Sequence, residues 1–180
     1  MQQKTYDIVY TGMFAVLLAI CSWISIPTLI PFTLQTFGVF LTLFVLGGKR
    51  GTGVIALYLL LGSIGIPVFS HFGAGLGYLL GNTGGYALGF IFIALVMWIS
   101  DVFFGRKMPF QIIAALIGLT ICYIFGTVWF FLITSGTQSN LNIFSTLGIC
   151  VFPFVIPDFC KLLLACILYK RLQATSLINL

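Results

Sequence analysis

The chain has 180 residues, of which 61% are hydrophobic and only 6% are charged, and its formal net charge is +5. A soluble core of this size could not hide so much apolar surface, so the composition excludes a soluble globular domain and indicates an integral membrane protein. The basic residues form small groups separated by apolar runs, which argues against a nucleic-acid-binding surface.

Apolar runs long enough to cross a bilayer recur along the chain, since an α-helix needs roughly 17–25 such residues. Six candidates follow one another at 8–26, 32–48, 52–69, 83–104, 109–134 and 154–171. The first is longer than a signal-peptide core and lacks an A-x-A cleavage site, so we expect it to remain as a helix. We predict an all-α integral membrane protein with six transmembrane helices, one domain over residues 1–172 and a short cytoplasmic tail over 173–180.

The basic groups predict the orientation of these spans. They are Lys4, Lys49/Arg50, Arg106/Lys107 and Lys170/Arg171. With six spans all of them fall on the same side as both termini, and the positive-inside rule makes that side cytoplasmic. The segments 26–31, 70–82 and 134–142 then face outward, and none of them contains Lys, Arg, Asp or Glu.

The first predicted span has a stripe of small residues formed by Gly12, Ala15 and Ala19. Such residues let two helix backbones approach closely in a membrane. The spacing alone leaves open whether the contact is internal or with another protein.

The second predicted span begins with "PFTLQT", residues 31–36. Thr33 and Gln35 cannot share one face of a fully wound helix, but an unwound entry after Pro31 would aim both side chains inward. The alternative is an ordinary helix start at the membrane interface.

A glycine-rich stretch, "GLGYLLGNTGGYALG", leads into the fourth span. Gly81, Gly85 and Gly89 recur every four residues and predict a smooth helix face for close packing. Asn82 and Tyr86 would lie one turn apart on the neighbouring face, where an amide above an aromatic ring suits a polar heterocycle. No phosphate-binding loop is present, because "GGKRG" lacks both its spacing and its hydroxyl.

The last predicted span contains "IPDFCKLLLA", in which Asp158 and Lys161 are three residues apart and can share a helix face. A charge at membrane depth costs roughly 2.5–3.5 kcal/mol, so such residues usually mark a functional site. We expect Pro157 in the first turn of the helix, which would place Asp158 at its positive end and Lys161 about one turn deeper. The alternative is a structural ion pair without a ligand.

The motifs "PFTLQT", "GKRG" followed by "ALYLLLGSIGIPVF", "LLGNTGGYALGF" and "FPFVIPDFCKLLLA" together resemble the BioY family over residues 9–172. BioY proteins are the biotin-specific substrate-binding components of energy-coupling factor (ECF) transporters. The resemblance implies a six-helix protein that captures biotin from outside the cell. It also implies a transmembrane coupling subunit and two cytoplasmic ATPases, so that ATP is used by partners and this chain needs no cofactor. The five cysteines contain no C-x-x-C pair, and we predict neither a metal site nor a disulfide.

Several residues gain expected roles from this resemblance. Ala15 and Ala19 match an alanine pair that contacts the coupling subunit, whereas Asn82, Asp158 and Lys161 match the ligand pocket. Asn82 stands where we expect proline in many relatives.

Biotin has two ureido N–H donors, one ureido carbonyl, an apolar thioether ring and a carboxylate. Asp158 can accept the N–H groups, and Lys161 can neutralise either Asp158 or the ligand carboxylate. Asn82 with Thr33 or Gln35 can meet the ureido carbonyl, and Tyr86 and Trp129 are candidate walls. We therefore predict a biotin-uptake protein that is not an enzyme. The alternatives are a solitary biotin facilitator and a substrate-binding component for another small vitamin; an intramembrane enzyme and a purely structural subunit are disfavoured.

Overall fold

The apolar runs form long helices in the computed structural model, which describes residues 2–27, 30–135 and 143–175. The helices are α1 (Gln2–Trp23), α2 (Gln35–Leu46), α3 (Gly48–Ser63), α4 (Leu76–Leu79), α5 (Gly84–Phe104), α6 (Met108–Ser135), α7 (Ile143–Cys150) and α8 (Phe152–Ala174). A short 3-10 helix, η1 (Ser70–Phe72), precedes α4. Two-residue strands β1 (Ser25–Ile26) and β2 (Phe32–Thr33) pair antiparallel, and all other secondary-structure elements of the described residues are helices, as predicted.

Within the described ranges, four segments are long and apolar enough to cross a membrane: Tyr6–Trp23, Gly84–Phe104, Met108–Ser135 and Thr146–Ala174. The predicted spans 32–48 and 52–69 correspond to shorter helices, because α2 has 12 residues and α3 has 16. The run 32–48 begins as extended backbone in β2, and residues 49–51, expected as a connection between the two spans, lie in the first turn of α3. Helix α7 was not predicted, since its apolar residues were assigned to no span.

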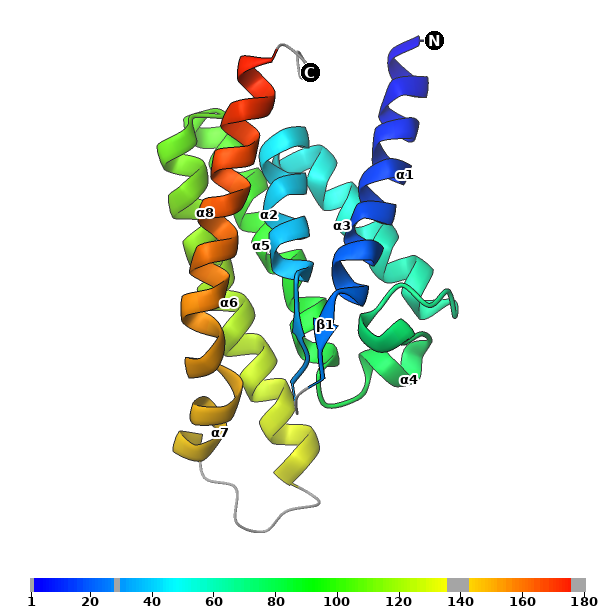
Figure 1. Ribbon diagram of the computed structural model, residues 1–180, viewed down its shortest axis with the longest axis vertical. Coiled ribbons are helices and arrows are strands. Elements are labelled where there is room, and N and C mark those ends of the chain that lie inside the picture. Colours follow the sequence, from blue (N-terminus) through cyan, green and yellow to red (C-terminus); the bar gives the residue numbers. More distant parts are fainter. Residues whose placement is uncertain (1, 28–29, 136–142, 176–180) are drawn as a thin grey trace.

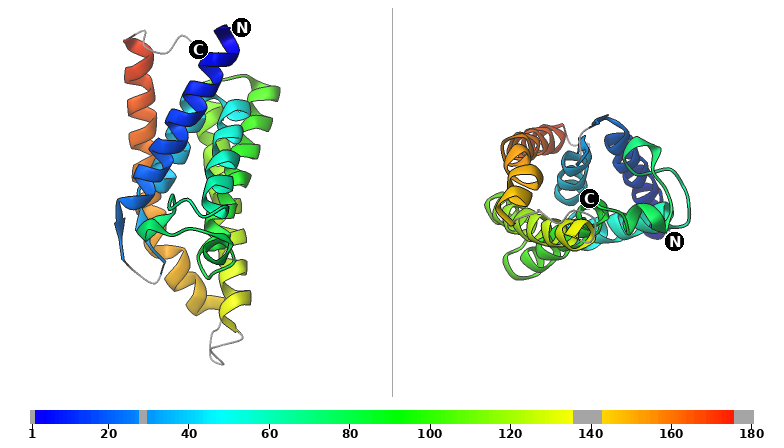
Figure 2. Two further views of the ribbon diagram at one scale, coloured as in Figure 1. Left: turned by 90° about the vertical axis from the view of Figure 1, so that its right-hand side faces the viewer. Right: turned by 90° about the horizontal axis from the view of Figure 1, so that it is seen from below.

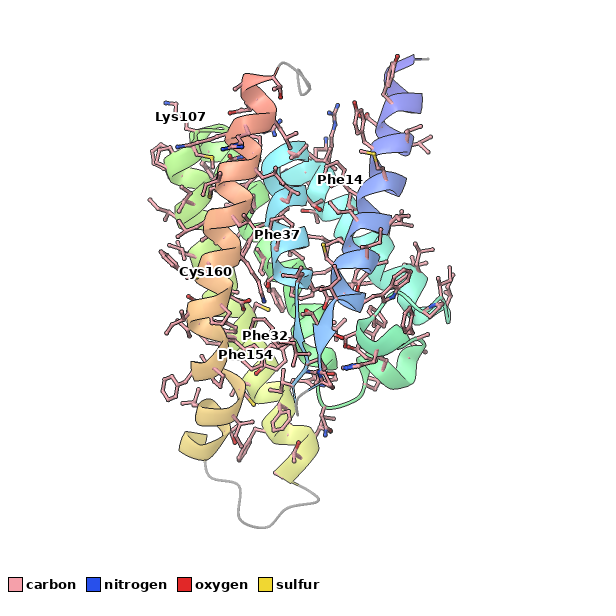
Figure 3. The ribbon with its side chains drawn as sticks, viewed as in Figure 1. Phe14, Phe32, Phe37, Lys107, Phe154 and Cys160 are labelled. Atoms are coloured by element: carbon pink, nitrogen blue, oxygen red, sulfur yellow. The ribbon has the colours of Figure 1, made fainter. Side chains whose placement is uncertain are left out.

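The two ends of the molecule differ in what they contain. The start of α1, the α2–α3 and α5–α6 connections and the end of α8 lie together at one end (Figure 1). The basic groups of those connections are therefore gathered there, and Lys107 is seen at that end in Figure 3. The β1–β2 hairpin, η1 and α4 lie toward the other end (Figure 1). The predicted outer segment 134–142 falls almost entirely outside the described residues.

A tight corner joins α2 to α3 at the basic end. Gly47 has φ 80°, a left-handed conformation that favours glycine. The Arg106 Nη2 donates to the carbonyls of Phe44 and Val45 at 2.9 and 2.8 Å. The Gly48 N–H donates to the Asp101 carboxylate at 2.7 Å. A cation thus lies at the negative end of α2 and an anion at the positive end of α3, which is the favourable pairing with both helix dipoles.

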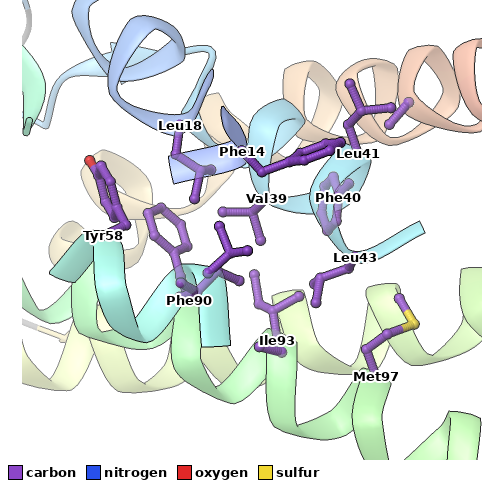
Figure 4. Close-up of a cluster of buried hydrophobic side chains, with 14 of the residues drawn as sticks. Phe14, Leu18, Val39, Phe40, Leu41, Leu43, Tyr58, Phe90, Ile93 and Met97 are labelled. Atoms are coloured by element: carbon purple, nitrogen blue, oxygen red, sulfur yellow. The ribbon is translucent and has the colours of Figure 1, made fainter. Parts of the chain in front are cut away.

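Helix α2 is the centre of the bundle. Seen from below, it stands between α8 and α1 (Figure 2), and every residue from Gly38 to Leu46 is buried. Its side chains Val39, Phe40 and Leu43 meet side chains of α1, α3 and α5 in the cluster shown in Figure 4. Because other helices enclose α2, polar side chains at its start are held away from lipid.

The predicted glycine face is found between α5 and α6. A Cβ atom on Gly85 would collide with Trp129, and one on Gly89 would come within 2.6 Å of the Cys122 sulfur. Gly81 precedes α5 and is not on this face. The glycines therefore bring the α5 backbone against α6 and fix the distance between the two helices.

Candidate ligand-binding site

A polar cavity of about 70 Å³ lies among the start of α2, the loop segments and helices α5 to α8. Its polar lining consists of Thr33, Gln35, Thr36, Ser70, Tyr78, Thr83, Tyr86, Tyr123, Asp158 and Lys161. The remaining lining is apolar and includes Ile30, Phe90, Leu119 and Phe154. A volume of this size holds a few water molecules and is smaller than the sites of drug-sized ligands.

Asp158 and Lys161 enter the cavity from the second and third turns of α8. The helix begins at Phe152 with a proline in its first two positions, so Pro157 lies inside the helix. The expectation that Pro157 occupies the first turn was wrong, because Pro153 provides that start instead. The relative placement of the two charged residues is unaffected, since both still lie on one buried face of α8.

The Asp158 carboxylate receives three hydrogen bonds from three different helices. Its Oδ1 accepts from Lys161 Nζ at 2.7 Å and from Thr36 Oγ1 at 2.8 Å. Its Oδ2 accepts from the Tyr123 hydroxyl at 2.6 Å. Asp158 is 3% exposed and Lys161 7%, so both charges have left water, and the pair and its hydroxyl donors offset that cost.

Lys161 has an aromatic neighbour as well as polar ones. Its Nζ lies 4.3 Å from the centre of the Phe32 ring and 3.2 Å from Thr36 Oγ1. The Phe32 ring stacks on Phe154 with centroids 6.0 Å apart, and the two side chains are seen together in Figure 3. The ammonium is thus held by an anion, a hydroxyl and a π-face, with apolar ring surface beside it.

The entry of α2 is unwound, as the prediction for "PFTLQT" requires. Thr33 is extended in β2, and its Oγ1 accepts the Gln35 backbone N–H at 3.2 Å at the point where the helix begins. Thr33 and Gln35 consequently both line the cavity, although they are only two residues apart.

Of the amide and aromatic candidates Asn82, Tyr86 and Trp129, only Tyr86 lines the cavity. Tyr86 lines the cavity, and its hydroxyl lies 3.0 Å from Thr127 Oγ1. Asn82 is exposed and is not among the lining residues, because α5 begins only at Gly84 and residue 82 does not share its helix face. Trp129 packs on Gly85 and donates its indole N–H to the Gly81 carbonyl at 3.0 Å, so it supports the α5–α6 contact from outside the lining.

Sequence reasoning missed Thr36 and Tyr123, the two hydroxyl donors to Asp158. Neither has a spacing signal, since the nearer of the two, Tyr123, is 35 residues from Asp158 in sequence. The available signal was chemical: a buried carboxylate has about four acceptor positions, and one lysine fills only part of them.

Ala15 and Ala19 are 4% and 5% exposed and belong to the main hydrophobic core. Gly12, by contrast, is exposed, as are the neighbouring Met13 and Val16. The alanine pair is thus covered by the chain's own helices, which favours internal packing in this conformation.

Comparisons with known proteins agree on one group. The BioY family model matches residues 1–177. A biotin transporter BioY of Thermotoga maritima is 37% identical over 170 residues, covering 93% of this chain and 95% of that protein. A probable biotin transporter BioY of Pyrococcus horikoshii is 32% identical and covers 96% and 99%. A crystal structure described as the S-component for biotin from an ECF-type ABC transporter has the same fold, with a TM-score of 0.82 at 24% identity over 96% and 93% of the two chains.

Proposed function

This chain belongs to the BioY family, and we propose that it takes up biotin across the membrane in which it is embedded as a multi-pass protein. The observation that carries the proposal is the buried Asp158–Lys161 pair beside a polar cavity with apolar walls. Such a cavity offers acceptors, a cation and ring surface, which match the ureido group, the carboxylate and the thioether ring of biotin.

The proposed topology has six membrane passages with both termini in the cytoplasm, one domain over 1–172 and a tail over 173–180. In this arrangement α2 with its extended entry and α3 are the two short passages; α2 is enclosed by other helices, whereas α3 keeps one face exposed. The positive-inside rule supports it, because the basic groups of the α2–α3 and α5–α6 connections lie together with the start of α1 (Figure 1). The cavity would then open to the outside.

Biotin would enter a cavity that is small in this conformation. At about 70 Å³ it must widen to admit the fused rings, so binding requires the walls to separate. We propose Asp158, Lys161, Thr33, Gln35 and Tyr86 as ligand-contacting residues, and we keep Asn82 and Trp129 as residues at the edge of the site whose role depends on that movement.

Energy for release would come from partner proteins. The sequence has no phosphate-binding loop, so we propose that the chain is a substrate-binding component, without ATPase activity, that acts with a coupling subunit and two cytoplasmic ATPases. Contact of Ala15 and Ala19 with the coupling subunit remains part of this proposal, and it requires α1 to expose residues that are buried here.

The test is equilibrium binding of labelled biotin to the purified protein in nanodiscs, with competition by riboflavin, thiamine and other small vitamins. Saturable submicromolar binding that only biotin displaces is expected. No binding of biotin together with binding of another vitamin would overturn the substrate, whereas uptake of biotin in cells that lack every coupling subunit would replace the ATP-driven model with a solitary facilitator.

The coupling contact is tested with Ala15→Leu/Ala19→Leu and the lipid-facing control Val16→Leu. The double variant should bind biotin but fail to retain the coupling subunit in a pull-down, while the control retains it. Equal retention by both variants would show that the alanine pair serves internal packing alone.

A further inference from the structure

A chain of buried hydrogen bonds runs from the loop after α3 to the wall of the cavity. The Tyr58 hydroxyl donates to the Val68 carbonyl at 2.9 Å, and the Gln35 side-chain amide nitrogen donates to the Tyr58 hydroxyl. Gln35, Tyr58 and Val68 are 7%, 1% and 7% exposed. Gln35 lines the cavity, whereas Tyr58 lies behind it, at the edge of the core cluster in Figure 4.

The number of available protons fixes which group donates and which accepts in each of these hydrogen bonds. A carbonyl has none, so two oxygens 2.9 Å apart need the single proton of Tyr58 between them. The hydroxyl of Tyr58 can then only accept from Gln35, and the group facing it must be the NH₂ of the amide. Ser22 is compatible with this direction, because its single proton goes to the carbonyl of Ala19 or of Val68, and the Val68 carbonyl has two lone pairs and can accept from both Ser22 and Tyr58.

The other end of the Gln35 amide is therefore an acceptor. Its carbonyl oxygen takes part in no hydrogen bond within residues 2–27, 30–135 and 143–175, and the side chain lines the cavity. Asp158 offers a second acceptor, because a carboxylate has about four acceptor positions and three are filled by Lys161, Thr36 and Tyr123. Gln35 and Asp158 line the same cavity, and Thr36, the residue after Gln35, donates to Asp158.

A cyclic urea presents its two N–H groups on opposite sides of its carbonyl, and they point away from each other. One carboxylate with a single open position cannot satisfy both. We propose that Asp158 accepts one ring N–H of the ligand, that Gln35 accepts the other, and that Tyr58 is the positioning residue that fixes the Gln35 amide for this task. The inference rests on the proposed function and deepens it, and it reverses the sequence-based expectation that Gln35 meets the ureido carbonyl.

The first test is a double-mutant cycle on biotin affinity. Tyr58→Phe and Gln35→Met should each weaken binding about tenfold, which is what one hydrogen bond in a buried site contributes. The double variant should bind no more weakly than Gln35→Met alone, since Tyr58 acts through Gln35. Additive losses, or an unchanged affinity in Tyr58→Phe, would overturn the positioning role.

The chain provides a matched control for loss of a tyrosine hydroxyl. Tyr169 is also buried and also accepts from a glutamine, Gln173 Nε2 at 2.7 Å, but neither residue lines the cavity. Tyr169→Phe should leave biotin affinity unchanged. An equal loss in both tyrosine variants would assign the effect to general destabilisation and overturn the proposal.

The second test uses the two biotin isomers that carry one N-methyl group on either ring nitrogen, in competition with labelled biotin. Wild type should reject both. Gln35→Ala, which removes the acceptor and leaves room for a methyl group, should accept one isomer far better than wild type and still reject the other. If Gln35→Ala binds both isomers better than wild type, or neither, then the assignment of one ring N–H to Asp158 and the other to Gln35 is wrong. If wild type does not bind biotin at all, the proposed function fails, whereas tight biotin binding with either overturning result rejects only this inference.

Discussion

Asp101 and Asp158 show two uses of a carboxylate, one at the end of the protein that holds the basic groups and one in its interior. Asp101 lies in the end that holds the basic groups and accepts the Gly48 N–H at the start of α3, where the helix dipole is positive. Asp158 lies in the interior and is held by a lysine and two hydroxyl groups. The first arrangement satisfies a helix end and fixes a corner. The second uses only side chains, which can exchange partners, and it borders a cavity.

The ion pairs of the two regions differ in the same way. Arg50 and Asp7 are 3.0 Å apart with side chains 42% and 46% exposed, whereas Lys161 and Asp158 are 2.7 Å apart with side chains 8% and 4% exposed. An exposed pair contributes about 0–1 kcal/mol, but removing one partner of a buried pair costs about 3–5 kcal/mol. Burial therefore makes the inner pair the more sensitive target for substitution.

The largest effect is expected for Lys161→Ala. This change leaves the Asp158 carboxylate buried with hydroxyl donors alone, and it should abolish measurable biotin binding and destabilise the protein by about 3–5 kcal/mol. Asp158→Asn should weaken binding at least tenfold, or about 1.4 kcal/mol. Thermal unfolding in detergent and biotin titration separate the two losses, and a folded Asp158→Asn/Lys161→Ala protein with normal affinity would refute the site.

Tyr123→Phe should have the next largest effect. It removes one donor to a charged acceptor, a bond of about 1.5–3 kcal/mol, so biotin affinity should fall by about tenfold or more. Tyr6→Phe, on the exposed part of α1, provides the control. Unchanged affinity in Tyr123→Phe would mean that Asp158 is held well enough by Lys161 and Thr36.

Arg106→Ala tests the other side of the comparison. Loss of its bonds to the α2 carbonyls should lower the free energy of unfolding by about 1–2 kcal/mol, while the biotin dissociation constant stays the same. Differential scanning fluorimetry and biotin titration on one preparation give both values. A large loss of affinity would show that the α2–α3 corner positions the ligand site.

The smallest effect is expected for Arg50→Gln, which breaks the half-exposed pair with Asp7. The change in unfolding free energy should stay below about 1 kcal/mol and should shrink further in high salt, because such pairs are screened. A salt-independent loss above that value would mean that Arg50 has an additional partner.

The sequence predicted the inner pair but not its surroundings, and the reason is physical. A charge in an apolar run is costly wherever the run lies, so Asp158 and Lys161 could be selected without a fold. A hydroxyl in an apolar run costs far less free energy than a charge, so it does not stand out in the sequence. Tyr123 becomes a donor to Asp158 only when α6 and α8 lie side by side. The same holds for Tyr58, whose effect on Gln35 depends on a carbonyl in the following loop.

The limits of the helices could likewise be predicted only where the sequence leaves one choice. The spans 83–104 and 109–134 were predicted to within a residue of α5 and α6, because uninterrupted apolar runs define them. The limits of α2, α3 and α8 were missed where glycine and proline allow several starts: Gly47 permits a corner with no loop, and Pro153 competes with Pro157 as the first-turn proline.

The hydrogen bond from Thr36 to Asp158 joins residues 122 positions apart, and its consequence concerns the order of synthesis. A ribosome releases α2 long before α8 exists, so a nascent chain holds half of the site with the hydroxyl groups of Thr36 and Tyr123 lacking their acceptor. Only the arrival of the final helix brings the carboxylate and ammonium to them. Ligand present in the surroundings can therefore select finished molecules, and biotin added during expression should raise the yield of full-length protein but not of a chain that stops before α8.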